Sequence, residues 1–230
     1  MLLVATATEQ EMRAALSLLR PPPPLSQGRV ESVRLAGQEC ALLVTGVGLV
    51  NAAFSLGRAL SLPGLKGVLN LGIAGSFSSV KFPLGSIVVA RQEIWPEYGL
   101  GLENGVDAQA LGFPLAVGET GPIWDRLNLE PEKAAEIMGL RLGKDWPGVD
   151  SLSVSTVSAC QPRARELGEG YAAGIENMEG FALAYGCALQ GLPFLEVRSI
   201  SNMVGSREPG KWDIKTAFTA LGRVLPELLG

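Results

Sequence analysis

The chain has 230 residues, 19 Lys and Arg against 23 Asp and Glu, a formal net charge of −4, 47% hydrophobic residues and 18% charged residues. This balance excludes an intrinsically disordered chain and argues against a nucleic-acid binder that works through a broad basic surface. The sequence has no histidine, which excludes a Ser-His-Asp triad, a Cys-His dyad, an HExxH zinc site and a histidine general base.

Apolar runs of strand length alternate with helical patterns along the whole chain. In chain order we expect a strand over 2–7, a helix over 9–19, a hairpin over 30–35 and 39–45, a helix over 49–62, a strand over 68–71, a glycine-rich turn over 72–76, a strand over 86–91, long loops over 95–125, a helix over 131–140, a strand over 149–157, a helix over 162–169, a strand over 172–175, a helix over 178–190, a strand over 194–200 and a helix over 214–229. This alternation predicts an α/β fold, a single domain over 1–230 with three α/β/α layers. We expect its central sheet to be mixed and twisted or partly closed.

The three cysteines, Cys40, Cys160 and Cys187, are far apart and form no CxxC pattern. We expect three free, buried thiols in a reducing cytosol. The N-terminal segment has no basic region ahead of its apolar residues, and no apolar run reaches the roughly 20 residues that span a bilayer. The sequence therefore predicts a cytoplasmic protein that binds neither membrane nor nucleic acid.

Four polar or glycine-rich clusters stand at the ends of predicted elements, where α/β folds place their sites. They are residues 8–11 (TEQE), the glycine turns at 46–48 (GVG) and 72–75 (GIAG), residues 176–179 (ENME) and residues 198–202 (RSISN). Each cluster also has a plain structural interpretation, as a helix cap, a tight turn or a solvated helix start. Spacing alone does not choose between the two.

Taken in order, five segments resemble one family: 7–11 (ATEQE), 46–48 (GVG), 70–75 (NLGIAG), 177–180 (NMEG) and 197–202 (VRSISN). They are similar to the nucleoside phosphorylase/nucleosidase superfamily, and within it to the hydrolytic methylthioadenosine/S-adenosylhomocysteine nucleosidase branch. The resemblance spans nearly the whole chain. It implies a purine nucleoside as substrate, no metal or organic cofactor, and a homo-oligomer, a dimer or tetramer.

The resemblance also implies residue roles. Glu11 matches the acid that activates the attacking water, and Glu179 matches the carboxylate that accepts hydrogen bonds from the ribose 2′ and 3′ hydroxyls. Met178 matches the residue packed against the sugar, and Ser201 and Arg198 match residues near the water and the base. Further substrate-binding candidates in or near the shared segments are Ala74, Gly75, Val157, Ala159 and Asn177.

The chemistry of the residues agrees with hydrolysis. Cleavage of an N-glycosidic bond passes through an oxocarbenium-like state that carboxylates can stabilise, as in O-glycoside hydrolysis. Phosphorolysis would need a cationic phosphate cradle, and the phosphorylase branch carries an arginine-bearing loop after its first strand. Here residues 8–11 (TEQE) occupy that place, and their charge would repel phosphate.

Asn202 departs from the adenine-specific nucleosidases, which carry an aspartic acid at this position that protonates the purine N7. A carboxamide both donates and accepts, which suits the O6 acceptor and the N7–H donor of a protonated 6-oxopurine. We therefore expect a catalytic role for Asn202 and a hypoxanthine-type leaving group. Two segments, 201–207 (SNMVGSR) and 154–159 (VSTVSA), resemble the futalosine hydrolase subfamily of menaquinone biosynthesis. The expected hypoxanthine-type leaving group agrees with this resemblance.

The substrate of that subfamily carries a carboxyphenyl group on a 5′ arm. Arg207 is a candidate for its carboxylate, and Trp95, Tyr98 and Trp212 are candidates for lining the arm, although each also fits a surface, core or interface position. The alternatives are a methylthioadenosine nucleosidase with a relaxed base pocket, an inosine-type phosphorylase and a non-catalytic nucleoside-binding module.

Overall fold

The computed structural model describes the chain apart from residues 18–22, 104, 119–120, 207 and 209–211. Within the described residues, nine strands form one large sheet: β1 (Leu2–Thr6), β2 (Val30–Leu35), β3 (Gln38–Val44), β4 (Gly67–Ser76), β5 (Ile87–Ile94), β10 (Arg126–Asn128), β11 (Gly148–Ser153), β12 (Ile175–Asn177) and β13 (Phe194–Met203). Two small hairpins lie between β5 and β10: β6 (Leu100–Leu102) with β7 (Gly105–Asp107), and β8 (Ala116–Gly118) with β9 (Gly121–Ile123). The described helices are α1 (Glu9–Ala15), α2 (Leu49–Ala59), α3 (Pro131–Met138), α4 (Gln161–Gly170), α5 (Gly180–Leu189) and α6 (Ile214–Leu229).

The large sheet closes on itself in part. Strand β4 pairs with β12 and β13, β5 pairs with β11 and β13, and β11 pairs with β12, so these strands form a ring. Strands β1, β3 and β2 extend the sheet beyond β4, and β10 extends it beyond β5. Because the ring combines parallel and antiparallel pairs, the prediction of a mixed, partly closed sheet is confirmed.

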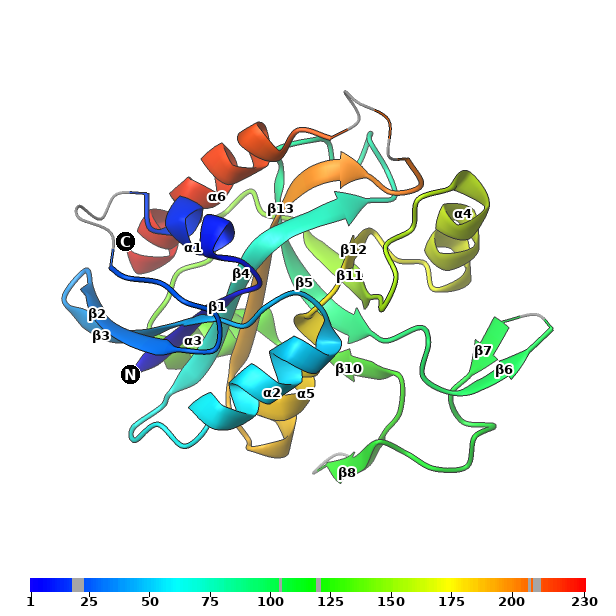
Figure 1. Cartoon of the computed structure of the whole chain (residues 1–230), viewed down its shortest axis with the longest axis horizontal. Helices are drawn as coiled ribbons and strands as arrows, with labels where there is room; N and C mark the ends of the chain where they lie inside the picture. Colours follow the sequence, from blue (N-terminus) through cyan, green and yellow to red (C-terminus); the bar gives the residue numbers. More distant parts are fainter. Residues whose placement is uncertain (18–22, 104, 119–120, 207, 209–211) are drawn as a thin grey trace.

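Helices cover both faces of the sheet, because alternate residues of a strand face opposite sides. In β1, Leu2 and Val4 pack in one core with α1, α3 and α6, whereas Leu3 and Ala5 pack in another core with α2 and α5. Figure 1 shows α1 and α6 on one side of the central strands and α2 and α5 on the other. The three-layer prediction is therefore confirmed.

Several predicted element boundaries are wrong. The strand expected over 149–157 ends at Ser153. The glycine-rich segment over 72–76 is not a turn, because it continues β4 and pairs residue by residue with β13. The strand expected over 172–175 begins only at Ile175, after α4. One cysteine also differs from expectation: Cys160 is exposed, whereas Cys40 and Cys187 are buried.

The topology brings the sequence clusters to one edge of the sheet. Strands β3, β1, β4 and β13 run parallel to one another, so their carboxyl ends meet at the same edge. Strand β12 runs antiparallel beside the last residues of β4. Separately, none of the described helices has the length and apolar character needed to cross a bilayer.

Candidate active site

A cavity of about 300 Å³ opens at this edge of the sheet. The predicted site residues that line it are Glu11, Ala74, Gly75, Val157, Asn177, Met178, Glu179, Ser201 and Asn202. A larger hollow of about 500 Å³ lies beside α4, but no predicted site residue lines it. The smaller cavity is therefore the candidate active site.

Two of the described contact residues do not line the cavity. Arg198 is completely buried behind it, and Ala159 is exposed. The inward-facing neighbour of Ala159 is Ser158, which Glu176 holds by two hydrogen bonds. Arg207 lies outside the described residues.

Glu11 is fixed at the start of α1 by a capping box. The backbone N–H and the hydroxyl of Thr8 donate to its Oε2 at 2.9 and 2.8 Å, and the backbone N–H of Ile73 donates to Oε1 at 3.0 Å. The carboxylate is only 4% exposed but lines the cavity. The capping interactions of α1 therefore also hold this carboxylate in the cavity wall.

Glu179 stands at the N-cap of α5. Its Oε1 accepts from the backbone N–H of Gly48 at 2.9 Å, which ties the 46–48 turn to the site. Asn177 caps the same helix, because its Oδ1 accepts from the backbone N–H groups of Glu179 and Gly180. Burial raises the pKa of Glu179 to about 6, against the opposing effect of Arg198 and the Gly48 N–H.

Arg198 is the positive charge beneath the two glutamates. Its Nε donates to Glu196 Oε1 at 2.8 Å and its Nη2 to Asn177 Oδ1 at 3.3 Å. Its Nη1 has no partner among the described residues. A Cβ atom on Gly72 would overlap that nitrogen and lie 2.8 Å from Glu11 Oε1, so the glycine allows the guanidinium to approach Glu11. Burial opposes the charge of Arg198, but the surrounding carboxylates outweigh burial and raise its pKa.

A second pair of buried carboxyl groups lies deeper. Glu93 and Glu196 are both completely buried, and Glu93 Oε1 and Glu196 Oε2 both lie beside the Cα of Gly180. Ser153 Oγ donates to Glu93 Oε2 at 2.6 Å, and Asn177 Nδ2 donates to Glu93 Oε1 at 2.8 Å. Burial and the neighbouring Glu196 raise the pKa of Glu93 well above its ordinary value. Two such groups cannot readily both ionise, so we expect Glu93 to keep its proton.

Gly75, Ser201 and Asn202 form another part of the cavity wall. The pairing of β13 with β4 skips Ser201, because Ile200 is opposite Ala74 and Asn202 is opposite Gly75. This bulge lets two consecutive side chains face the same cavity, which a regular strand would not allow. Ser201 Oγ lies 2.8 Å from Asn202 Oδ1 and 3.2 Å from the carbonyl oxygen of Ala74.

Of the aromatic candidates for the 5′ arm, Trp212 lines the cavity. Trp95 and Tyr98 do not: Trp95 stacks on Tyr98 and packs near Phe181 in the core beneath α5. For Trp95 the structure therefore shows the core position that the sequence also allowed, and neither residue is a lining candidate for the arm. Ile214 and Phe218, at the start of α6, line the cavity instead. The sequence predicts only a helix over 214–229 and gives these two residues no separate role.

Comparison with known proteins agrees with the fold. The phosphorylase superfamily matches residues 2–227, and the chain belongs to that superfamily. The chain is 34% identical to the futalosine hydrolase of Thermus thermophilus over 199 residues, 85% of this chain and 83% of the relative. It is also 34% identical to the futalosine hydrolase of Streptomyces coelicolor over 243 residues, 99% of this chain and 96% of the relative.

Further comparisons concern the fold and the alternative function, that of a methylthioadenosine nucleosidase. The structure of futalosine hydrolase from Helicobacter pylori superposes with a TM-score of 0.71 at 18% identity, over 98% of this chain and 95% of that one. This likeness concerns the fold. Several 5′-methylthioadenosine/S-adenosylhomocysteine nucleosidases match at 24% to 27% identity.

Proposed function

We propose that this protein is a futalosine hydrolase, which cleaves the N-glycosidic bond of a 6-oxopurine nucleoside with water and releases hypoxanthine. The observation that carries the proposal is one cavity lined by two carboxylates, Glu11 and Glu179, and by the carboxamide of Asn202. The 34% identity to futalosine hydrolases over most of the chain supports it.

In this mechanism the sugar lies between the two glutamates. The C1′–N9 bond breaks as its electron pair moves to the purine, and the ribose develops oxocarbenium character that nearby carboxylates stabilise. Glu11 takes a proton from the attacking water, whose oxygen bonds to C1′. Glu179 accepts hydrogen bonds from the ribose hydroxyls, and Met178 packs against the sugar. Solvent supplies the proton that N7 carries as the purine leaves, and Glu11 returns its own proton to solvent, so that one water is added across the C1′–N9 bond.

The charge of the cavity supports water rather than phosphate as the nucleophile. Three glutamates, Glu11, Glu176 and Glu179, are among its described lining residues, and no lysine or arginine is. A phosphate dianion needs cationic donors or helix N-termini aimed at it. Arg198 is completely buried and already donates to Glu196 and Asn177.

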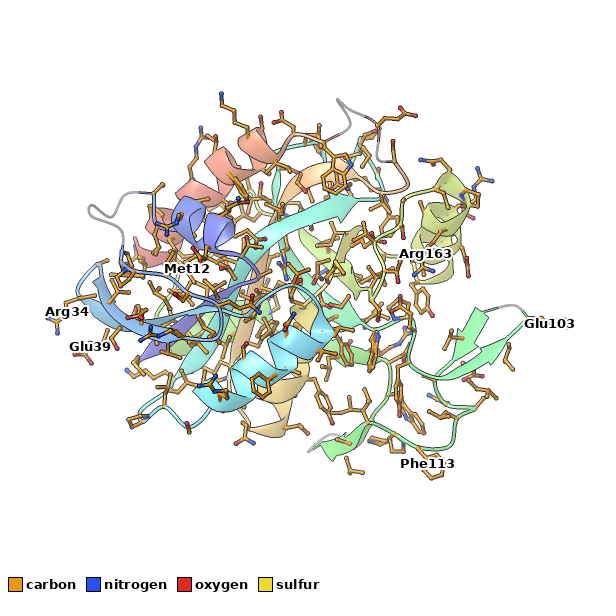
Figure 2. All side chains as sticks on the ribbon, in the orientation of Figure 1. Met12, Arg34, Glu39, Glu103, Phe113 and Arg163 are labelled. Carbon is orange, nitrogen blue, oxygen red and sulfur yellow. The ribbon has the colours of Figure 1, made fainter. Side chains whose placement is uncertain are left out.

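We further propose that the protein forms a homo-oligomer. Val50 and Phe54 on α2 are 84% and 67% exposed, and Phe113 and Val117 near β8 are 74% and 77% exposed. Figure 2 shows Phe113 at the outer rim of the molecule. Val50 and Phe54 are one helical turn apart on α2, and neighbouring exposed apolar side chains are typical of an interface. The mass in solution from light scattering tests this proposal. The resemblance further implies menaquinone biosynthesis and a cytoplasmic location, which the three free thiols support.

The test is an incubation in phosphate-free buffer with futalosine, inosine or methylthioadenosine, followed by chromatography of the released bases. We expect hypoxanthine from futalosine and no gain on adding phosphate. Release of adenine from methylthioadenosine alone would return the protein to the adenine-specific nucleosidases, and a requirement for phosphate would refute hydrolysis. A nucleoside-binding module would release no base and would tolerate Glu11→Gln.

A further inference from the structure

Glu176 is a buried carboxylate in the cavity that the proposed reaction does not use. It is 6% exposed and lines the cavity from β12. The backbone N–H of Ser158 donates to its Oε1 at 2.9 Å, and the Ser158 hydroxyl donates to Oε2 at 2.5 Å. These two bonds fix the orientation of the carboxylate against the 154–159 segment.

The sheet places Glu176 across the base end of the cavity from Asn202. Glu176 is opposite Gly75 in the pairing of β12 with β4, and Asn202 is opposite Gly75 in the pairing of β13 with β4. Neighbouring strands are about 4.8 Å apart, so the two Cα atoms are roughly 10 Å apart. A Cβ on Gly75 would lie 3.0 Å from Asn202 Nδ2. Because Gly75 has no side chain, the space between Glu176 and Asn202 stays open.

Asn202 alone does not decide which purine fits. A carboxamide offers a donor and an acceptor, and a flip exchanges them. Ser201 can support either orientation, because its hydroxyl lies within hydrogen-bond distance of both Asn202 Oδ1 and the Ala74 carbonyl oxygen. If the amide flips, the hydroxyl turns to Ala74 and accepts from Asn202. The discrimination must come from a group that cannot exchange donor for acceptor.

We propose that Glu176 selects the base by accepting a hydrogen bond from N1–H of a 6-oxopurine. An ionised carboxylate only accepts. Hypoxanthine presents a donor at N1, whereas adenine presents a lone pair there, which the carboxylate would repel. Glu176 then contacts the base at N1–H, and Asn202 contacts it at O6 and N7–H. The inference rests on the proposed function and names the residue that makes the cavity specific for its base.

The first test uses the wild-type protein and three free bases as inhibitors of futalosine hydrolysis. Hypoxanthine offers N1–H, 1-methylhypoxanthine replaces that hydrogen with a methyl group, and adenine has no hydrogen at N1. A hydrogen bond to a charged group predicts that hypoxanthine inhibits about 10- to 100-fold more strongly than either of the other bases. Equal inhibition by hypoxanthine and adenine would overturn the proposal.

The second test is Glu176→Gln, which keeps an oxygen for the Ser158 N–H and replaces the other acceptor with a donor. We expect the preference for hypoxanthine over adenine to fall by at least about 10-fold. Glu132→Gln, on the exposed side of α3, controls for the loss of one charge and should leave the preference unchanged. If Glu176→Gln does not fold, Ser158→Ala removes one of the two bonds that orient the carboxylate and should lower the preference in part.

The outcomes separate this inference from the proposed function. If wild-type protein releases hypoxanthine from futalosine but Glu176→Gln and Ser158→Ala both keep the full preference, Glu176 does not read the base. If wild-type protein releases no hypoxanthine from any nucleoside, the proposed function fails first.

Discussion

Replacing Glu179 with glutamine should stabilise the protein at neutral pH while removing most of its activity. The carboxylate is 5% exposed, and its pKa is raised from 4.5 to about 6, chiefly by burial. A group whose pKa is raised on folding favours the folded state while it is protonated. That contribution is fully present below pH 4.5 and is lost as the pH rises through about 6.

The magnitude follows from the size of that shift. One pKa unit corresponds to about 1.4 kcal/mol, so the ionised Glu179 costs the folded state about 2 kcal/mol above pH 7. Glutamine has the same shape, carries no charge and keeps an oxygen for the Gly48 N–H. Glu179→Gln should therefore raise the free energy of unfolding by up to about 2 kcal/mol at pH 8 and by close to nothing at pH 4.

Urea unfolding of wild type and variant from pH 4 to pH 8 measures this difference, with Glu132→Gln on α3 as an exposed control. The same residue predicts that kcat/KM of the wild type falls below about pH 6, because the carboxylate must be ionised to accept from the ribose hydroxyls. Loss of two charge-assisted hydrogen bonds should lower kcat/KM of the variant about 100-fold or more. Two results would refute the reasoning: a variant that is less stable than wild type at pH 8, or a variant whose gain in stability is the same at every pH.

The remaining predictions concern other carboxylates and one close contact. Glu11→Gln should lower kcat by about 10²- to 10⁴-fold while the dissociation constant for substrate stays near that of wild type; an unchanged kcat in single-turnover assays would exclude it as the base. Gly72→Ala should lower both activity and stability, the latter by about 1–3 kcal/mol, because the new Cβ overlaps the buried guanidinium. Gly57→Ala, where a Cβ meets nothing within 4 Å, is its control in thermal unfolding. Glu196→Ala should cost about 3–5 kcal/mol in urea unfolding, because it leaves a buried cation without its partner. Glu93→Gln should leave the free energy of unfolding close to that of wild type. A loss of about 3–5 kcal/mol would instead show that Glu93 is ionised.

The sequence predicted most of the fold because the strands and helices follow simple periodicities. The prediction failed where pairing with a distant strand determined the local structure. Residues 72–76 read as a turn because glycine disfavours strands, yet their pairing with β13 extends β4 to Ser76. In this segment glycine leaves room for side chains of β13, such as Arg198 against Gly72. That distant requirement outweighs the local preference of the residue.

The candidate site was predicted in part for a similar reason. The residues with motif support, such as Glu11, Glu179 and Asn202, line one cavity. Glu93 and Glu196 gave no signal, because each is a single acid in an apolar strand and the ring of the sheet alone brings them together. Arg198 was expected at the substrate, but Glu196 and Asn177 hold its guanidinium behind the cavity.

The buried charges explain how this cavity can be strongly negative without unfolding the protein. Glu11, Glu93, Glu176, Glu179 and Glu196 are all buried among the described residues, and Arg198 is the one cation that is buried with them. If Glu93 holds its proton, Glu196 neutralises Arg198 behind the cavity. Burial is the main cause of the raised pKa of Glu179, and repulsion by Glu11 and Glu196 adds to it. A positive charge that develops on the sugar relieves this repulsion. The same carboxylates that repel one another before the reaction therefore stabilise the transition state.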